Sequence, residues 1–215
     1  MRKESQYSNK ENQYFTNVRY DIIDMIPKKP NKVLEIGCGS GATLVELKKQ
    51  NKAEFTVGVD IVDKSIPGID SHIVGDIENT IIPFEEKYFD VIICADVLEH
   101  LVDPWAVVHA MLKFLKDGGL LIASIPNVRE IGVLWKIVIK GDFAYSAQGI
   151  LDKSHLRFFC KKNIYNLFIG NNLKVIKMKR RRRNKFKVVL DYITFRIFSD
   201  FLTCQYVIAG RMNNV

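Results

Sequence analysis

The sequence predicts a single α/β domain in which helices cover both faces of a seven-stranded, mostly parallel β-sheet. Three observations lead to this prediction. Short apolar segments of strand length alternate along the chain with longer amphipathic segments. The apolar segments are rich in β-branched residues and lack polar alternation, which is typical of strands buried on both faces. A glycine-rich turn follows the first strand directly, and parallel sheets bind ligands at that edge.

The first two thirds of the chain predict five strands and three helical segments. The strands are expected at residues 32–36, 54–59, 72–74, 89–94 and 119–124. The helices are expected at residues 14–26, 41–51 and 104–116. The first helix ends at the sequence Pro-Lys-Lys-Pro, which stops helices. The last one begins with Asp103 as N-cap and Pro104 in the first helical position.

The last third of the chain has a less regular pattern. Residues 126–160 form an insert that is expected to begin with a helix and to fold over the site as a lid. The elements after it are a short helix ending near Gly170, a strand at 173–178, an amphipathic helix at 186–201 and a strand at 204–212. The single domain, 1–215, thus carries an N-terminal helical cap (1–30), the lid and a basic segment with its helix (177–203).

Charge and cysteine content narrow the functional classes. The net charge is +8, but residues 177–187 hold eight cations and no acid, while the remainder has 24 basic and 24 acidic residues. The basicity is local, so it does not by itself predict nucleic-acid binding. The four cysteines are scattered, which favours reduced thiols in the cytoplasm. No apolar stretch reaches the roughly 18 residues that cross a bilayer, and no signal sequence is expected.

The glycine turn is compatible with two cofactors. Gly37 and Gly39 allow a tight turn and close approach of a ligand, and Asp60 ends the second strand, where an acid can bind ribose. A dinucleotide such as NAD fits this pattern nearly as well as S-adenosylmethionine does. Two further acids decide between them, because Glu35 inside the first strand and Asp76 after the third would repel a pyrophosphate but suit a cationic sulfonium and ammonium. As alternatives, the glycines form a plain turn and Asp76 caps a helix or turn.

The ordered motifs resemble those of class I S-adenosylmethionine-dependent methyltransferases, from about Asn31 to Asn127. The motifs are "VLEIGCGSG", "VGVD", "VGDIE", "YFDVIICADVLEHLVDP" and "FLKDGGLLIASIPN". The resemblance implies a Rossmann-like fold and S-adenosylmethionine as cofactor. It implies cofactor contacts from Tyr14 or Phe15, Arg19, Glu35, Gly37, Cys38, Gly39, Asp60, Ile61, Asp76, Ile77, Ala95, Asp96, Val97 and His100. Among these, Arg19 would hold the methionine carboxylate.

The segment "GILDKSHLRFF", residues 149–159, is the expected acceptor side of the site. It resembles a tract in bacterial methyltransferases of cell-surface polysaccharide and sugar pathways, which implies a hydroxyl on a sugar or glycan intermediate as acceptor. His155 titrates near neutrality and is a candidate base, Asp152 would orient it, and Arg157 would hold an anionic substrate or pin the lid. The alternative is that this tract only packs the insert on the core.

The pattern Asp96-x-x-Glu99-His100 also permits a divalent cation together with His155. Some quinone and small-RNA methyltransferases have a related metal site, but Glu-His after the fourth strand is widespread in metal-free members. The shorter Asp96 stands where those metal sites have a glutamate. We therefore predict no metal here.

The basic run 177–187 has three interpretations: a solvated turn, a face that contacts an anionic membrane surface, or a nucleic-acid site. A solvated or membrane-surface face is favoured, because no aromatic stacking platform accompanies the arginines. The protein is then expected to be cytoplasmic and membrane-peripheral. Rival functions are an RNA methyltransferase that uses Arg180–Arg183, an NAD-dependent sugar-nucleotide oxidoreductase, and a cofactor-binding subunit without catalysis. The sequence does not predict the oligomeric state.

Overall fold

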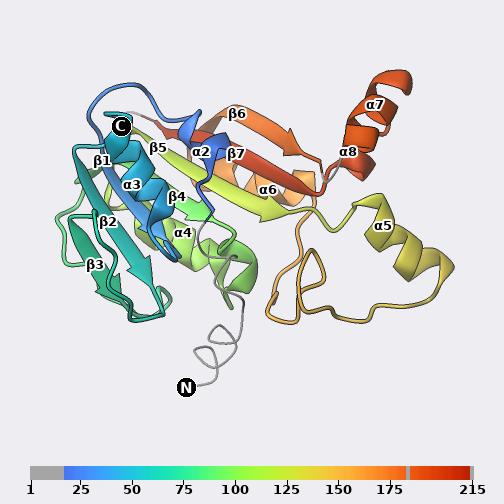
Figure 1. Ribbon diagram of the computed structural model, residues 1–215, viewed down its shortest axis with the longest axis horizontal. Helices are drawn as coiled ribbons and strands as arrows, with labels where there is room; N and C mark the ends of the chain where they lie inside the picture. Colours follow the sequence, from blue (N-terminus) through green and yellow to red (C-terminus); the bar gives the residue numbers. More distant parts are fainter. Residues whose placement is uncertain (1–16, 183–184, 214–215) are drawn as a thin grey trace.

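The computed structural model describes residues 17–182 and 185–213, which form a seven-stranded sheet flanked by helices (Figure 1). The strand order is β3-β2-β1-β4-β5-β7-β6. Neighbouring strands from β3 to β5 are parallel, and β7 is antiparallel to both of its neighbours. The strands are β1 (Lys32–Ile36), β2 (Phe55–Asp60), β3 (Ser71–Val74), β4 (Phe89–Ala95), β5 (Leu115–Pro126), β6 (Leu173–Arg181) and β7 (Gln205–Met212). The predicted seven-stranded Rossmann-like sheet is confirmed.

Helices pack on both faces of the sheet, as the apolar strands predict. The helices are α2 (Tyr20–Ile23), α3 (Ala42–Lys49), η2 (Leu98–His100), α4 (Pro104–Leu112), α5 (Ile131–Leu134), η3 (Trp135–Ile139), α6 (Lys161–Ile169), α7 (Lys185–Ile193) and α8 (Ser199–Leu202). One core cluster contains α2, α3 and Val33 of β1, and the other contains α4, α6 and Leu34. Adjacent residues of one strand therefore enter opposite cores, which explains why the strand is apolar throughout.

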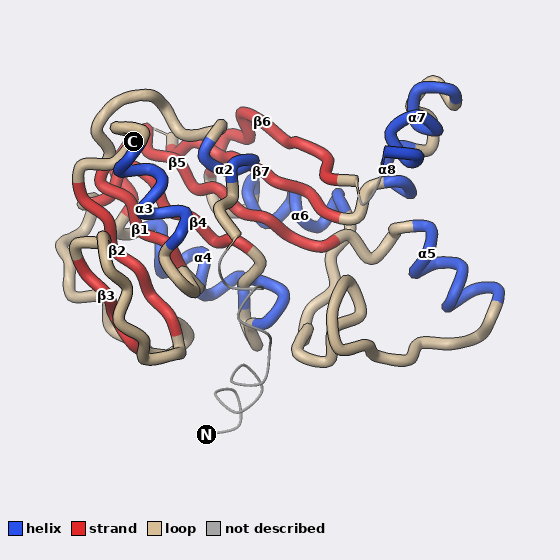
Figure 2. Tube along the Cα trace, viewed as in Figure 1, coloured by secondary structure: helices blue, strands red, loops and turns tan. Residues whose placement is uncertain are grey.

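The turn between β1 and α3 requires glycine. Gly37, Gly39 and Gly41 have φ angles of 68°, 55° and 69°, a region that favours glycine. A Cβ atom on Gly37 would also overlap the Cγ2 atom of Val97, which follows β4. The turn can therefore lie close to the end of β4 only because this side chain is missing. Figure 2 shows the turn among the loops at the carboxyl ends of the strands.

Several element boundaries differ from the sequence-based expectation. The helix expected at 104–116 ends at Leu112, because Leu115 already pairs with Phe89 of β4. The strand expected to end at Met178 continues to Arg181, which pairs with Gln205 of β7. The helix expected at 186–201 is divided into α7 and α8, because the intervening Phe195 and Arg196 have positive φ angles. Of the N-terminal helix expected at 14–26, only Tyr20–Ile23 is helical among the described residues, and residues 1–16 lie outside them.

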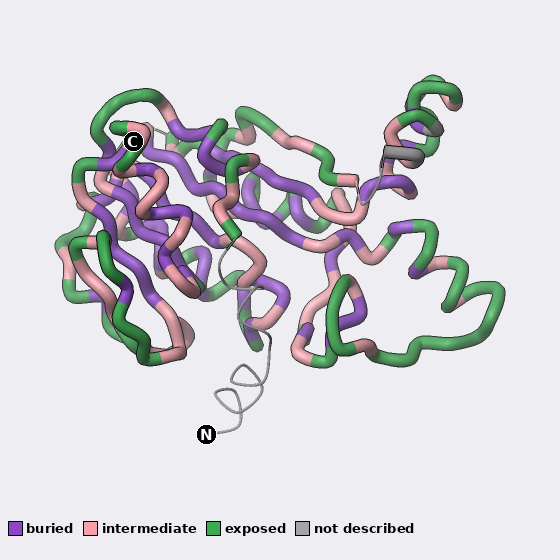
Figure 3. The backbone as a smooth tube through the Cα atoms, in the orientation of Figure 1, coloured by how far each residue is buried: buried purple, intermediate pink, exposed green. Residues whose placement is uncertain are grey.

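The insert 126–160 leaves the sheet at the end of β5 and returns at α6. Its two ends are joined by a bridge between Asn127 and Phe159. The first part is the helix α5–η3, whose second half has π-helical hydrogen bonding, and Figure 1 shows it lying to the side of the sheet near α7 and α8. Its surface is largely exposed (Figure 3). Residues 154–157 pack on η2, and Phe159 enters the core, so the end of the insert adjoins the sheet.

The described helices are all too short or too polar to cross a bilayer. The four cysteines, Cys38, Cys94, Cys160 and Cys204, are free thiols, in agreement with their scattered positions in the sequence.

Replacement of Gly37 by alanine should destabilise the protein by about 1–3 kcal/mol more than the matched variant Gly141→Ala. Both glycines have positive φ, at 68° and 61°, but a Cβ on Gly141 meets nothing within 4 Å. The difference therefore isolates the overlap with Val97. Urea unfolding of both variants measures it, and equal losses of stability would show that Val97 moves aside without cost.

Candidate functional site

A cleft lies at the carboxyl ends of β1, β2 and β4, where the glycine turn approaches the sheet. Its cavity volume is about 290 Å³, close to the lower end of small-molecule sites, which is about 300 Å³. The lining includes every predicted cofactor residue within the described part of the chain: Arg19, Glu35, Gly37, Cys38, Gly39, Asp60, Ile61, Asp76, Ile77, Ala95, Asp96, Val97 and His100. Tyr14 and Phe15 lie outside the described residues.

Glu35 is the most unusual group in the cleft. It lies inside β1 with 3% of its surface exposed, and its Oε2 atom has no hydrogen-bond partner among the described residues. Burial raises its pKa to about 8; Arg19 opposes this rise and the nearby Asp60 adds to it. At neutral pH the raised pKa favours the protonated, uncharged carboxyl group, and a cationic donor from a ligand would favour its ionised form.

Asp60 and Asp76 end two neighbouring strands and face the same cleft. The Asp60 carboxylate accepts hydrogen bonds from the main-chain N–H groups of Gly39, at 2.8 Å, and Val62, at 2.9 Å. These bonds tie the glycine turn to the end of β2. Asp76 accepts from the N–H of Glu78 at 3.2 Å. Both acids are thus fixed by main-chain contacts, and both remain at the cleft surface.

Arg19 enters the cleft from the N-terminal side and is 11% exposed. Its guanidinium donates to Asp96, to the Asp21 carboxylate at 3.0 Å and to Ser124 Oγ at 2.9 Å. Although burial disfavours its charged form, Asp96 and Asp21 raise the pKa of Arg19 above its ordinary value. The guanidinium is therefore a fixed cation whose charge is already shared with two carboxylates.

Asp96 has a φ angle of 57° and is held on several sides. Besides Arg19, the hydroxyl of Ser124 donates to it at 3.1 Å and the amide of Gln205 also donates to it. These contacts fix Asp96 at the junction of β4, β5 and β7. Its carboxylate is directed to them and not to Glu99 or His100, which follow it in the chain.

Sequence reasoning missed Arg181, which also lines the cleft. It ends β6 and donates to Gln205 Oε1 at 3.1 Å. Its neighbours in the basic run form internal ion pairs, Arg180 with Asp200 at 4.0 Å and Arg182 with Asp191. Arg180 and Arg181 belong to β6 and not to a turn, but both are exposed, so the solvated or membrane-surface role of the run stays a prediction. Only the register of β6 against β7 could have placed Arg181 here.

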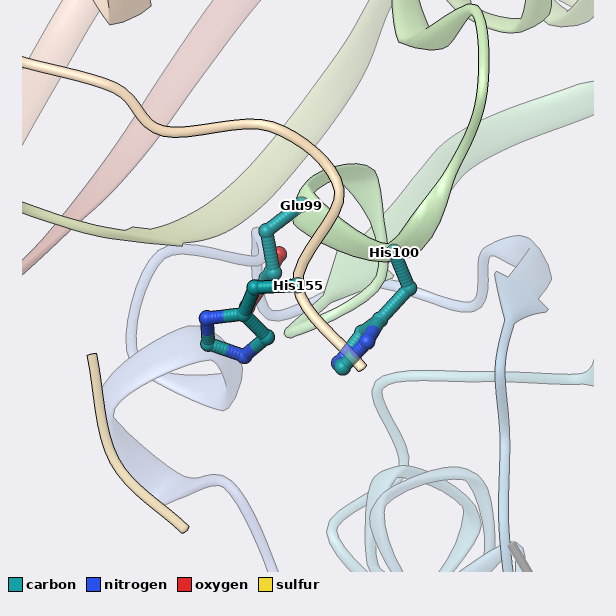
Figure 4. Close-up of side chains that lie close together, drawn as sticks. All are labelled: Glu99, His100 and His155. Carbon is teal, nitrogen blue, oxygen red and sulfur yellow. The ribbon is translucent and has the colours of Figure 1, made fainter. Parts of the chain in front are cut away.

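His155 is buried beside the cleft, behind His100. The two rings lie edge to face with 4.7 Å between their centroids (Figure 4). The Nδ1 atom of His155 lies 2.9 Å from the Ile150 carbonyl oxygen. A carbonyl only accepts, so this contact places the proton on Nδ1. Asp152 accepts from the main-chain N–H and the hydroxyl of Ser154, and these bonds shape the turn that carries His155.

Arg157 binds the loop that follows η2. Its Nε atom donates to the carbonyl oxygen of Val102 at 2.9 Å, and its Nη2 atom donates to the same oxygen. The main-chain N–H groups of Leu156 and Arg157 donate to the Glu99 carbonyl at 2.8 and 3.0 Å. The contacts match the predicted role of Arg157 in pinning the insert. Its role toward an anionic substrate stays a prediction.

Comparison with known proteins identifies methyltransferases with similar sequences. A family model described as a methyltransferase domain matches residues 11–178. The ubiquinone biosynthesis O-methyltransferase of Neisseria meningitidis is 33% identical over 132 residues, which are 56% of this chain and 55% of that protein. The protein of that name from Idiomarina loihiensis is 36% identical over 106 residues, which are 45% of this chain and 42% of that protein. The chain spans about half the length of these relatives.

Two solved structures share the fold. A SAM-dependent methyltransferase from Archaeoglobus fulgidus has a TM-score of 0.68 and 18% identity, with 94% of each chain covered. The 1,6-didemethyltoxoflavin-N1-methyltransferase of Burkholderia thailandensis, solved with 1,6-didemethyltoxoflavin and S-adenosylhomocysteine, has a TM-score of 0.67 and 12% identity. The alignment covers 98% of this chain and 85% of that one.

The variant Glu35→Gln should stabilise the ligand-free protein at alkaline pH. A folded-state pKa near 8 means that the folded protein keeps a proton that the unfolded chain loses near pH 4.5. The stability of the natural protein should therefore fall as pH rises from about 5 to 8, and the variant should lack that part of the fall, on the order of a few kcal/mol. Urea unfolding at pH 6, 7 and 9 measures this, with the exposed Glu54→Gln as control. Parallel profiles for Glu35→Gln and the natural protein would contradict the raised pKa.

Proposed function

The chain belongs to the methyltransferase family whose domain model covers residues 11–178, and from that membership we propose that it moves a methyl group from S-adenosylmethionine to a hydroxyl group of a small-molecule acceptor. The observation that carries the proposal is the buried carboxyl group of Glu35 in the cleft, whose Oε2 atom has no hydrogen-bond partner among residues 17–182 and 185–213. Two relatives are named O-methyltransferases, which supports oxygen as the methylated atom.

The charges of the cleft fit a cofactor that has cations and no phosphate. The ionisable carboxyl groups of the lining are those of Glu35, Asp60, Asp76 and Asp96, against the two guanidiniums of Arg19 and Arg181. A pyrophosphate would meet this excess of carboxylates with unfavourable energy. In this proposal Glu35 accepts from the ammonium group, Asp60 from the ribose hydroxyls and Asp76 from the adenine amino group. The rival dinucleotide function is therefore less well supported.

Positioning is the main contribution that these residues can make. A bound sulfonium supplies an activated methyl group, so the protein must align the acceptor oxygen with it. Alignment can supply about 7–11 kcal/mol, whereas a general base adds about 3–5 kcal/mol. Gly37 and Glu35 border the cleft on the β1 side, and His100 borders it on the side of the insert. The acceptor would thus approach the cleft on the side of His100.

We favour a sugar or glycan intermediate as the acceptor, on the likeness of residues 149–159 to the tract of sugar-pathway methyltransferases. The segment contributes His155 and ties the insert to η2 through the Glu99 carbonyl. Nucleotide sugars and free sugars assayed for methyl uptake test this choice. If phenolic hydroxyl groups take up methyl and sugars do not, the acceptor is a phenol and not a sugar.

The exposed side of α5–η3 and α7–α8 supports contact with an anionic membrane surface. Trp135 and Ile139 of η3, Ile193 of α7 and Phe195 of the α7–α8 connection are between 56% and 88% exposed. The cation Arg196 follows Phe195 in the same connection. Apolar and aromatic groups with nearby cations are typical of helices that rest on lipid headgroups. Lys187 of α7 pairs with Glu130 at the start of α5, which joins the two parts. The membrane face would therefore lie here.

Calorimetry with S-adenosylhomocysteine and NAD separates the two cofactor classes. We expect S-adenosylhomocysteine to bind and Asp60→Ala to weaken it about 10- to 150-fold, because charge-assisted bonds of about 1.5–3 kcal/mol are lost. Asp63→Ala is the matched control, since Asp63 is exposed just beyond the cleft. Tight binding of NAD without binding of S-adenosylhomocysteine would refute the proposed function.

Replacing both Trp135 and Phe195 by alanine should weaken cosedimentation with anionic phosphatidylglycerol vesicles at least several-fold. The control is Ile81→Ala, which removes an apolar side chain of 87% exposure at the opposite end of the sheet. Binding to neutral phosphatidylcholine vesicles, measured in parallel, shows how much of the binding depends on the charge of the lipid. If the double variant and the control bind vesicles equally, the membrane face is not at these helices.

A further inference from the structure

A second pocket adjoins the cofactor cleft and carries the opposite charge. Its volume is about 310 Å³, and its described lining holds three cations, Lys179, Arg180 and Arg181, with one carboxylate, Asp21. Arg181 lines both this basic pocket and the cleft, so the two are neighbours. We propose that the basic pocket binds a phosphate group carried by the methyl acceptor. This inference rests on the proposed function, to which it adds the class of substrate.

Lys179 and Arg181 reach the pocket from one face of the edge strand β6. They are two residues apart in the strand, so their side chains leave the same face. The register pairs Lys179 with Val207 of β7, which belongs to the core cluster of α2. The Nζ atom of Lys179 also donates to the main-chain carbonyl oxygen of Asp21 in α2 at 3.2 Å. Both cations therefore lie on the side of the sheet that α2 covers.

The Asp21 carboxylate does not cancel these cations, because Arg19 already neutralises it. The Nε and Nη2 atoms of Arg19 donate to the two carboxylate oxygens, each at 3.0 Å. Burial opposes the ionisation of Asp21, but Arg19 and, to a smaller extent, Arg181 hold its pKa below its ordinary value. Arg19 belongs to the lining of the cleft and not to that of the basic pocket. The pocket therefore keeps an excess of positive charge.

Lys179 and Arg180 form loose ion pairs with acids outside the lining. The Nζ atom of Lys179 lies 3.7 Å from the carboxylate of Asp24, which is 68% exposed, and the Nε atom of Arg180 lies 4.0 Å from that of Asp200. Ion pairs that are long and partly exposed to water contribute little energy. Neither pair therefore prevents these cations from turning to a bound anion.

Arg181 connects the basic pocket to the cleft through an uncharged partner. It donates to Gln205 Oε1 at 3.1 Å, and the amide nitrogen of Gln205 donates to Asp96 in the cleft. Because Gln205 is uncharged, the guanidinium keeps its charge for a ligand. A guanidinium can bind two oxygens of one phosphate, and the ammonium of Lys179 can bind another. A molecule with its phosphate at these two cations can extend past Gln205 into the cleft.

The opposite charges of the two cavities favour different ligands. The described lining of the cleft has four carboxyl groups against two guanidiniums, which disfavours a phosphate there. The basic pocket has three cations against one neutralised carboxylate, which suits a phosphate with two charges better than a carboxylate with one. The cofactor and the anionic part of the acceptor thus occupy separate cavities. Phosphorylated sugars, whether water-soluble or linked to lipid, combine such a phosphate with free hydroxyl groups.

Calorimetry of the full chain with inorganic pyrophosphate tests the site. Lys179→Gln and Arg181→Gln should each weaken binding about three- to tenfold, because each removes a charge-assisted contact. Lys179→Arg keeps the charge and should bind pyrophosphate like the natural protein. Lys174→Gln is the matched control, since it removes an exposed cation of the same strand that lines neither cavity. Circular dichroism verifies the fold of each variant.

Two further measurements identify the source of the phosphate. Sugar phosphates and the matching free sugars are assayed for methyl uptake, and we expect the phosphorylated forms to react at lower concentration. Vesicles of phosphatidylcholine with phosphatidic acid are tested for binding. If Lys179→Gln weakens binding to these vesicles but not to pyrophosphate, the pocket binds a lipid headgroup and the inference about the acceptor is wrong.

The inference is also overturned if the folded natural protein does not bind pyrophosphate, or if Lys174→Gln weakens binding as much as Lys179→Gln, which would indicate diffuse attraction to the strand. Equal methylation of free and phosphorylated sugars would contradict it too. S-adenosylhomocysteine calorimetry on the same samples keeps the two proposals separate. Cofactor binding without pyrophosphate binding refutes only the phosphate site, whereas pyrophosphate binding without cofactor binding refutes the proposed function.

Discussion

The parallel pairing of β1 with β2 on one side and β4 on the other is the constraint on which the site depends. Glu35 lies opposite Gly58 of β2 and Ile93 of β4, so its carboxyl group is enclosed by apolar strands. The same register ends all three strands at one level, where Gly37, Asp60 and the residues after β4 meet. A slip of one residue would reverse which sheet face each side chain enters and disperse the site.

This constraint explains why the cofactor side of the site is readable from the sequence. Strands buried on both faces have an unmistakable composition, and their carboxyl ends must converge in a parallel sheet. Residues as distant as Arg19 and Asp76 therefore proved to line one cleft. The position of Arg181 in the cleft could not be predicted, because it depends on the antiparallel register of the edge strand β6. A run of like charges in the sequence does not indicate that register. The end of α4 at Leu112 could not be predicted for a similar reason. The pairing of β5 with β4 outweighs the helix propensity of the residues after Leu112.

The acids of the cleft divide into two electrostatic types. Asp96 is neutralised by Arg19 and surrounded by further donors, so it organises the junction of three strands. Glu35 has no such partner among the described residues and has a pKa near 8, which makes it costly to ionise in the ligand-free protein. A bound ammonium group would stabilise the ionised carboxylate of Glu35 and so offset the cost of its ionisation. Sequence alone treats these two carboxylates alike, because their difference arises from burial and from side chains on β5 and β7.

The position of His155 bears on whether it is a base. With its proton on Nδ1 toward Ile150, the ring could act as a base only through Nε2. A base must reach the acceptor, but His100 lines the cleft and His155 stands behind it. A base at His155 would need a relay through a second ring whose Nδ1 already donates to Ser154.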